Sequence, residues 1–186
     1  MSNAREQILQ TTCDLLEKQG YHGTGLNEIV KESGSPKGSL YYYFPDGKEQ
    51  ITAEAVLQSG RATSERIRLG LASSNSAAKA IHDFILLIAE NVESSGFAAG
   101  SPLTAVAMET ATKSERINLA CREAYGMLQT AFREKLLESG FSRIKAEELA
   151  TFIVASVEGG IILSRVSHTA DALRLVAKQL KPLLSL

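Results

Sequence analysis

The amino-acid sequence predicts an all-α protein of about nine helices. Apolar residues recur at i, i+3, i+4 and i+7 in successive segments along the whole chain, which is the spacing of amphipathic helices. Ser, Thr or Pro stands where most of these segments begin, and Gly stands where many of them end, as is typical of helix termini.

The composition predicts a soluble intracellular protein. A chain of 186 residues that is 44% hydrophobic and 22% charged can form one large core or two smaller ones. Cys13 and Cys121 are far apart and lack C-x-x-C spacing, so neither a disulfide framework nor a zinc site is predicted. Both lie on apolar stripes as core residues, with a redox-sensing thiol as the alternative. No apolar run approaches the roughly 20 residues that span a bilayer, and no signal peptide is recognised.

The charge distribution excludes one way of binding nucleic acid. Residues 1–60 carry five Lys or Arg against eight Asp or Glu, a net charge of -3, and residues 61–186 carry fifteen against thirteen, a net charge of +2. A broad basic field is therefore absent from the front of the chain. If this segment binds DNA, it does so through a few well-placed cations and hydrogen bonds.

Two helices are predicted within the first 33 residues. The first covers residues 5–18 and ends at Gly20. Thr24 stands at the start of the second, over residues 26–33, where its hydroxyl is expected to cap free backbone N–H groups.

A short third helix is predicted to begin at Pro36, with Ser35 as its cap. Leu40 and Phe44 lie at i and i+4 and are expected to face inward. The outward side then presents a cation and phenols suited to phosphates and base edges: Lys37, Gly38, Tyr41 and Tyr42, with Tyr43 as a further candidate. Two short helices joined by a Gly-containing turn match the helix-turn-helix motif. A three-helix packing module without a ligand fits the same spacing.

The order IVKESGSPKGSLYYYFP over residues 29–45, followed by Lys48-Glu49, resembles the DNA-binding signature of TetR-type transcriptional repressors. The resemblance implies an all-helical homodimer whose N-terminal three-helix unit binds operator DNA and whose larger C-terminal unit dimerises and binds an inducer. Two departures stand out, Val30 in place of the usual Ala and an extra residue in Pro45-Asp46-Gly47. The extra residue, like Gly20-Tyr21-His22, resembles the LmrA/YxaF-like branch.

Carried over by position, the resemblance implies a set of DNA contacts. Thr24 would contact phosphate at the start of the second helix, and Lys48 would meet the backbone from the start of the fourth. The recognition-helix contacts would be Lys37, Gly38, Tyr41 and Tyr42.

The rest of the chain is predicted to form a connecting helix and a second domain. The expected division is 1–47 for DNA binding, 48–75 for a connecting helix and linker, and 76–186 for effector binding and dimerisation. Ser59-Gly60 interrupts the connecting helix either as a tolerated glycine or as a pivot.

The late helices are expected to form a dimer interface. Gly159-Gly160 weakens the eighth helix twice over, and close approach of a helix across a two-fold axis would compensate. A kink within one subunit is the alternative. The resemblance places helices eight and nine in such an interface, and the expected residues are Phe152, Ser156, Gly159, Gly160, Leu173, Val176 and Leu180.

An effector pocket is expected between helices five and eight. Aromatic side chains and Met adapt to flat apolar ligands, although most of such a stripe is ordinary core. The candidates are Phe84, Ile88, Phe97, Met108, Tyr125, Leu128 and Phe132. Glu109 is the nearby acid that would meet a polar group of the effector.

These expectations combine into a cytoplasmic, homodimeric repressor that binds a palindromic operator and is released by a small apolar or aromatic effector. An enzyme is not predicted, because no nucleophile-base pair, paired acids or metal spacing is found, and no cofactor is expected. The other alternative is a helical adaptor that binds protein through its C-terminal helices and does not bind DNA.

Overall fold

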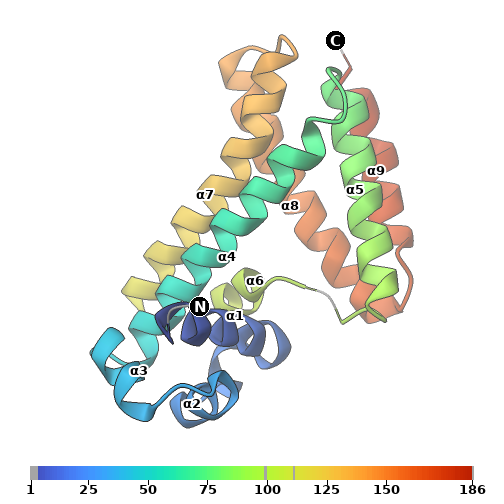
Figure 1. The fold of residues 1–186 in the computed structure, drawn as a ribbon. Coiled ribbons are helices and arrows are strands. Elements are labelled where there is room, and N and C mark those ends of the chain that lie inside the picture. Colours follow the sequence, from blue (N-terminus) through green and yellow to red (C-terminus); the bar gives the residue numbers. More distant parts are fainter. Residues whose placement is uncertain (1–3, 99, 111, 186) are drawn as a thin grey trace. The chain divides into compact units, whose positions relative to one another are not determined.

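The computed structural model describes residues 4–98, 100–110 and 112–185, and these residues form nine α-helices and no strand (Figure 1). The predicted all-α fold is therefore confirmed. The helices are α1 (Ala4–Gly23), α2 (Leu26–Ser33), α3 (Lys37–Tyr43), α4 (Lys48–Leu71), α5 (Ala77–Ser94), α6 (Pro102–Thr110), α7 (Glu115–Glu138), α8 (Arg143–Ser167) and α9 (Asp171–Leu183).

The chain forms two compact units. The first comprises residues 1–61 and 101–125, and the second comprises residues 62–100 and 126–186. The first unit therefore combines α1, α2 and α3 with α6, while α4 and α7 each contribute to both units.

The core of the first unit is built where α1 packs against α2, α3 and α6. Ile8, Leu16, Ile29 and Ile51 are completely buried, and each such side chain stabilises the fold by roughly 1.5–3 kcal/mol. Arg5 pairs with Glu54 and ties α1 to α4.

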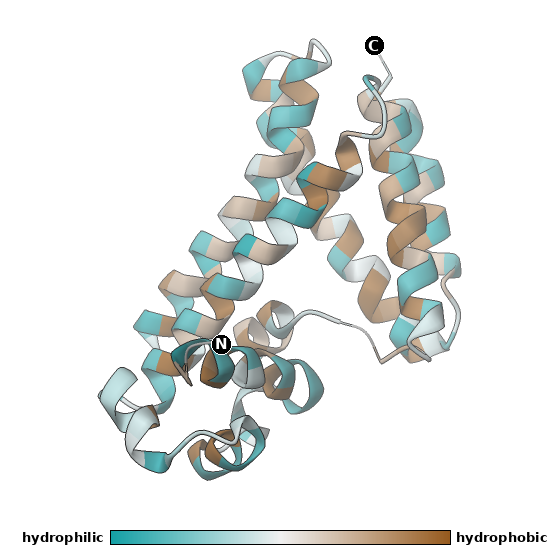
Figure 2. Ribbon diagram, in the orientation of Figure 1, coloured by the Kyte–Doolittle hydropathy of each residue, from teal (hydrophilic) through white to brown (hydrophobic). Residues whose placement is uncertain are grey.

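The core of the second unit lies between α5, α8 and α9, which run side by side (Figure 1). Apolar positions are frequent along α5 and α8 (Figure 2), and the completely buried ones include Ile81, Ile85 and Ile153. Arg174 donates two hydrogen bonds of 2.8 and 2.6 Å to the Glu93 carboxylate and joins α9 to α5. These bonds lower the pKa of Glu93.

The end of α1 differs from the prediction. The helix extends to Gly23, but it is broken at Gly20, whose φ of 71° and ψ of -174° are not helical. Thr24 does not cap α2, because its buried hydroxyl donates to the carbonyl oxygen of Gly20 at 2.8 Å. Gly25 is the N-cap instead, without a side-chain hydrogen bond.

The start of α3 is displaced by one residue from the prediction. The helix begins at Lys37, and Pro36 occupies the N-cap position in an extended conformation. The Ser35 hydroxyl is buried and makes no hydrogen bond among the described residues, so it does not cap the helix.

Three other helices begin at a serine cap, a residue type that the sequence places at many of the predicted helix starts. The Ser76 hydroxyl accepts from the backbone N–H of Lys79 at the start of α5, and Ser142 accepts from that of Lys145 at the start of α8. The Ser114 hydroxyl accepts from the backbone N–H of Ile117 at the start of α7. Each bond satisfies a backbone donor that the helix itself leaves free.

Helix α8 contradicts the expectation about apolar runs. Its length and composition, with a mean hydropathy of 1.6 over the most apolar window, would suffice to cross a membrane, and 39% of that window is buried inside the structure. Core helices of water-soluble proteins meet the same criterion. One face of α8 packs against α9, so part of its apolar surface is used within the second unit.

Gly60, for which the sequence suggested either a tolerated glycine or a pivot, is a point of close contact between helices. Helix α4 is continuous through it. A Cβ at Gly60 would lie 2.7 Å from the Cβ and 2.9 Å from the Cα of Ala124 on α7. The glycine therefore lets α4 and α7 approach closely inside the first unit.

We expect Gly60→Ala to lower the free energy of unfolding by about 1–3 kcal/mol, because the added methyl meets backbone atoms of Ala124 that cannot rotate away. Gly126→Ala is the matched control, since a Cβ there meets nothing within 4 Å and should stabilise α7 by about 0.5–1 kcal/mol. Urea denaturation measures both changes. Equal stabilisation by the two substitutions would refute the proposed close contact.

Candidate nucleic-acid interface

The helix-turn-helix is held together by two buried residues and one left-handed glycine. Gly34 ends α2 with φ 63°, and its N–H donates to the carbonyl oxygen of Lys31 at 3.3 Å. This conformation turns the chain sharply into α3 at no steric cost. Leu40 and Phe44 are completely buried, which fixes the side of α3 that faces the core.

The opposite side of α3 forms an exposed surface, here called the α3 face, made of Lys37, Gly38, Tyr41 and Tyr42. Tyr42 is 78% exposed and Tyr41 is 46% exposed. Tyr43 is half-buried, and its ring makes an edge contact with that of Tyr42 at a centroid distance of 5.1 Å. This contact steadies the Tyr42 ring while the α3 face remains open to a partner.

Gly38 has no structural requirement inside the chain. A Cβ at this position would meet nothing within 4 Å, and its φ is not in the left-handed region. A glycine inside a helix costs about 1 kcal/mol relative to alanine. Its missing side chain therefore leaves room for something outside the chain.

Lys48 is held at the start of α4 rather than extended into solvent. Its Nζ lies 4.3 Å from the centroid of the Tyr21 ring, in a cation-π contact. Burial lowers the pKa of Lys48, and the charge of Glu109 opposes this change. The Lys48 ammonium is thus held by a cation-π contact with Tyr21 and by attraction to the Glu109 charge, both in the same unit.

Thr24 does not fit its predicted role of presenting a hydroxyl to phosphate. Only 1% of its surface is exposed, and its hydroxyl is engaged with Gly20. The residue instead holds the break in α1 against the start of α2. Backbone N–H groups at that start remain available for an anion.

The predicted effector residues are divided between the two units. In the second unit, Phe84 makes an edge contact with Phe132 at 6.2 Å, and Leu128 is buried. Also in the second unit, Ile88 is half-buried, and Phe97 contacts the ring of His168 at 5.4 Å. In the first unit, the Tyr125 hydroxyl lies 3.3 Å from that of Thr104, and Met108 is 80% exposed.

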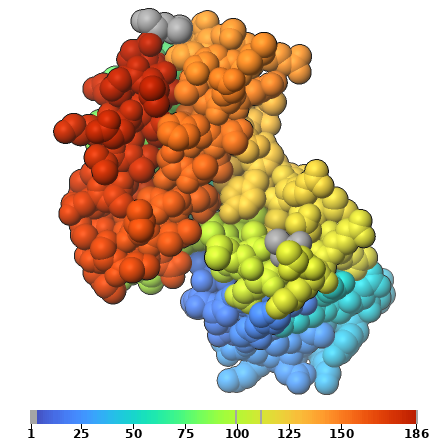
Figure 3. Space-filling view, turned by 180° about the vertical axis from the view of Figure 1, so that it is seen from behind, coloured from blue at the N-terminus to red at the C-terminus, as the bar shows by residue number. Residues whose placement is uncertain are grey.

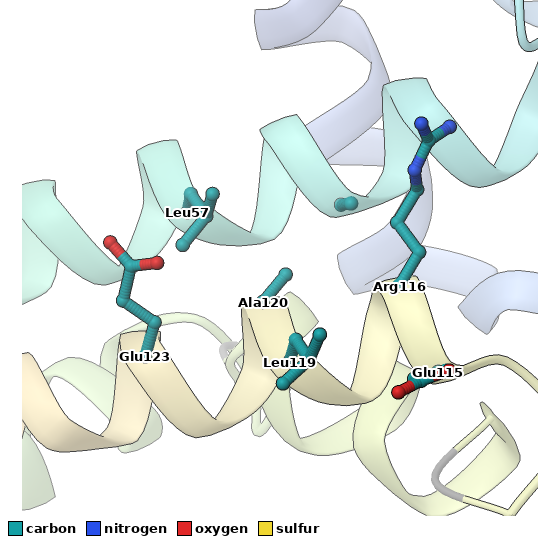
Figure 4. A pocket seen from close by; sticks show the side chains of 7 residues that line it. Leu57, Glu115, Arg116, Leu119, Ala120 and Glu123 are labelled. Atoms are coloured by element: carbon teal, nitrogen blue, oxygen red, sulfur yellow. The ribbon is translucent and has the colours of Figure 1, made fainter.

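An open groove of about 460 Å³ lies between α4 and α7 in the first unit (Figure 4). Leu57 of α4 faces Leu119 and Ala120 of α7 across its apolar floor, with Glu123 at one end. Arg116 at the other end is ion-paired with Asp46 at 2.8 Å. None of the seven predicted effector residues lines this groove.

The predicted dimer residues face two ways. Phe152 is 51% exposed, and a Cβ at Gly159 would meet nothing within 4 Å. A Cβ at Gly160, in contrast, would lie 2.9 Å from the Leu173 side chain of α9. Gly160, Leu173 and Leu180 are therefore buried within the chain, while Ser156 and Val176 are half-buried.

An outward apolar row on α8 was only partly predicted from the sequence, which gave Phe152 and Gly159 but not Ala155, Ile162 and Val166. It is here called the α8 seam, and its members recur at alternating steps of three and four: Phe152, Ala155, Gly159, Ile162 and Val166. Ile162 and Val166 are 44% and 76% exposed. Their spacing was the available signal, because it matches the repeat with which helices pair. Figure 3 shows the outer surface of α8 and α9.

No metal centre is formed by the described residues, since they contain no group of three or more His, Cys, Asp or Glu in suitable positions. Cys13 and Cys121 are both buried, and the Cys13 thiol donates to the carbonyl oxygen of Ala55. Both cysteines are thus buried in the first unit.

Comparison with known proteins agrees with this architecture. The family described as "Bacterial regulatory proteins, tetR family" matches residues 8–55, and that described as "Transcriptional regulator LmrA/YxaF-like, C-terminal domain" matches residues 77–179. The HTH-type transcriptional regulator YxaF of Bacillus subtilis is 40% identical over 178 residues, covering 96% of this chain and 93% of that protein. LmrA of the same organism is 39% identical over 171 residues, covering 92% and 91%.

Solved structures show the same fold at lower identity. A TetR transcriptional regulator from Legionella pneumophila superposes with a TM-score of 0.80 at 22% identity, covering 100% of this chain and 99% of that one. Reduced E. coli NemR superposes with a TM-score of 0.82 at 21% identity, covering 98% of each chain.

The fold and the helix-turn-helix define a DNA-binding transcriptional regulator. The chain belongs to the TetR family, in its LmrA/YxaF-like branch. Its relatives are transcriptional regulators, which confirms the prediction that it is not an enzyme.

We expect both cysteines of the native protein to react with a thiol reagent at least about 100-fold more slowly than in the unfolded chain, because only the thiolate reacts. Burial raises the pKa of Cys13 to about 12 and that of Cys121 to about 11. Labelling at mildly alkaline pH, followed by mass spectrometry, measures the two rates, with protein in guanidinium as the control.

The same pKa changes set the direction of a pH effect. The folded chain holds these protons more tightly than the unfolded chain, so this contribution to stability is present below the ordinary thiol pKa of 9.0 and is lost as the pH rises above it.

In the labelling experiment, rapid reaction of Cys13 in the native protein would support a redox-sensing thiol.

Proposed function

We propose that this protein is a repressor that binds a palindromic operator as a homodimer and is released by a small apolar or aromatic effector. The observation that carries the proposal is the α3 face, where Lys37 and two phenols are exposed on a helix fixed from behind by Leu40 and Phe44. Lysine and tyrosine at such positions contact phosphates and base edges. Chromosomal DNA as the partner places the protein in the cytoplasm.

The α8 seam supports the homodimer. Exposed apolar side chains at alternating steps of three and four can pair with the same row on a second copy across a two-fold axis. Gly159, which is open on the seam, would let the two backbones approach closely. We therefore retain Phe152, Ser156 and Gly159 as interface residues. We propose Ala155, Ile162 and Val166 in place of the other four predicted residues, because Gly160, Leu173 and Leu180 are buried and Val176 faces Gly160 within the chain.

A two-fold dimer explains how an effector would release DNA. Two recognition helices bind one palindrome only when they enter successive major grooves about 34 Å apart. An effector that binds better to a conformation with a different spacing shifts the population away from the DNA-competent state. The size of this shift is limited by the ratio of the effector's affinities for the two conformations. We propose the aromatic pair Phe84 and Phe132, with Leu128, as part of the effector site in the second unit.

An adaptor without DNA binding is the second candidate, because the same α8 seam would suit an apolar helix of another protein. The oligomeric state of the isolated protein distinguishes the two functions. A stable dimer covers the seam, whereas a monomer leaves it for another partner.

Lys37→Ala and Tyr42→Phe should each weaken binding to a palindrome from the region upstream of the gene. Each subunit should lose one phosphate contact at Lys37, so the dimer loses two, which should lower affinity at least about 10-fold and reduce the salt slope by about 2. Loss of one hydroxyl at Tyr42 should lower affinity about 3- to 10-fold. Fluorescence anisotropy at several salt concentrations measures both effects, with Lys145→Ala, a lysine of the second unit, as the control.

Gly38→Ala separates binding from folding in the same experiment. The added methyl meets nothing inside the chain and should stabilise α3, yet it should weaken operator binding because it occupies the space left for DNA. Operator affinity that is unchanged in Lys37→Ala, Tyr42→Phe and Gly38→Ala would rule out the α3 face as the DNA-binding surface.

Ile162→Glu should convert the dimer into a monomer and abolish binding to the full palindrome, because two carboxylates would be buried without partners near the two-fold axis. Leu87→Glu on α5 is the matched control, since Leu87 is 48% exposed and Ile162 is 44% exposed. Analytical ultracentrifugation reports the assembly. A dimer that survives Ile162→Glu would exclude the α8 seam as its interface.

A further inference from the structure

The break at the end of α1 is occupied by a carboxylate from α6. The Oε2 of Glu109 accepts a hydrogen bond of 2.8 Å from the backbone N–H of His22. A Cβ at Gly20 would overlap the Oε1 of the same carboxylate. The break frees an N–H group from helical bonding, and the carboxylate satisfies it as a cap would. Glu109 is thus committed to this contact and not to an effector.

This contact joins the two domains that the family comparison distinguishes. Glu109 lies within residues 77–179, which match the C-terminal domain, whereas Gly20 and His22 lie within residues 8–55, which match the DNA-binding domain. All three residues belong to the first compact unit, where α1 packs against α6. The C-terminal domain therefore supplies a charged group to the DNA-binding domain.

Two elements of the DNA-binding domain depend on the position of this break. Thr24, next to the N-cap of α2, is bonded to the carbonyl oxygen of Gly20. The Nζ of Lys48 lies 4.3 Å from the centroid of the Tyr21 ring, and the negative charge of Glu109 stabilises the same ammonium. Lys113 adds a contact of 3.4 Å from its Nζ to the Nε2 of His22.

We propose that Glu109 is a positioning residue for DNA binding, which holds the α1 break so that the start of α2 and the Lys48 ammonium meet the DNA backbone together. The assignment rests on the proposed function. Loss of this carboxylate would leave the His22 N–H without its acceptor and remove the contact that holds both elements.

Two substitutions in the full-length protein test the role. Glu109→Ala removes the acceptor, and Glu109→Gln keeps an oxygen that can accept from His22. We expect Glu109→Ala to lower operator affinity at least about 10-fold and to accelerate exchange of the His22 amide hydrogen, and Glu109→Gln to restore affinity to within about 3-fold of the unsubstituted protein. Fluorescence anisotropy and hydrogen exchange monitored by NMR give the two readouts.

The control separates positioning from general stability. Gly60→Ala strains the same unit at Ala124 without touching the break, so it should leave operator affinity within about 2-fold well below the unfolding temperature. Equal loss of affinity in Gly60→Ala and Glu109→Ala would overturn the positioning role, as would unchanged affinity in Glu109→Ala. No operator binding by the unsubstituted protein would overturn the proposed function itself, and the positioning role with it.

Discussion

Burial of Leu40 and Phe44 is the constraint on which the DNA-binding end of the molecule depends. A helix of seven residues is not stable by itself in water, because the cost of forming its first turn is not recovered over so short a length. Both side chains are fully buried, so packing supplies the missing stability and fixes the rotation of α3. That rotation exposes Lys37, Tyr41 and Tyr42 together. Without it, the same residues would form no common surface.

The charge balance determines how such a surface can work. The first 60 residues carry a net charge of -3, so long-range attraction to DNA is weak, and affinity must come from short contacts of defined geometry. The structure is consistent with this requirement, because the cation at Lys48 is held on the Tyr21 ring next to a carboxylate from α6. A protein that depends on geometry in this way is sensitive to small displacements of its helices, which suits regulation by a distant ligand.

Helix α8 shows why hydropathy alone misleads. The helix is apolar on two sides, and each side has its own reason. Gly160 and its neighbours pack against Leu173 of α9, which explains the inner side. Exposed Ile162 and Val166 lie on the outer side, where the proposed second copy would cover them. A helix covered on both sides by protein has the composition of a membrane span, although neither side needs lipid.

The sequence by itself determined the all-α class, the family and the bounds of α2 at residues 26–33, because these follow from local spacing and from turn residues such as Gly34. The inward residues Leu40 and Phe44 and the outward Tyr42 were predictable for the same reason. The roles of Thr24, Gly60 and Glu109, and the difference between Gly159 and Gly160, were not. Only the tertiary structure decided them, since each depends on which distant residue lies within a few ångströms, and helical periodicity carries no record of that neighbour.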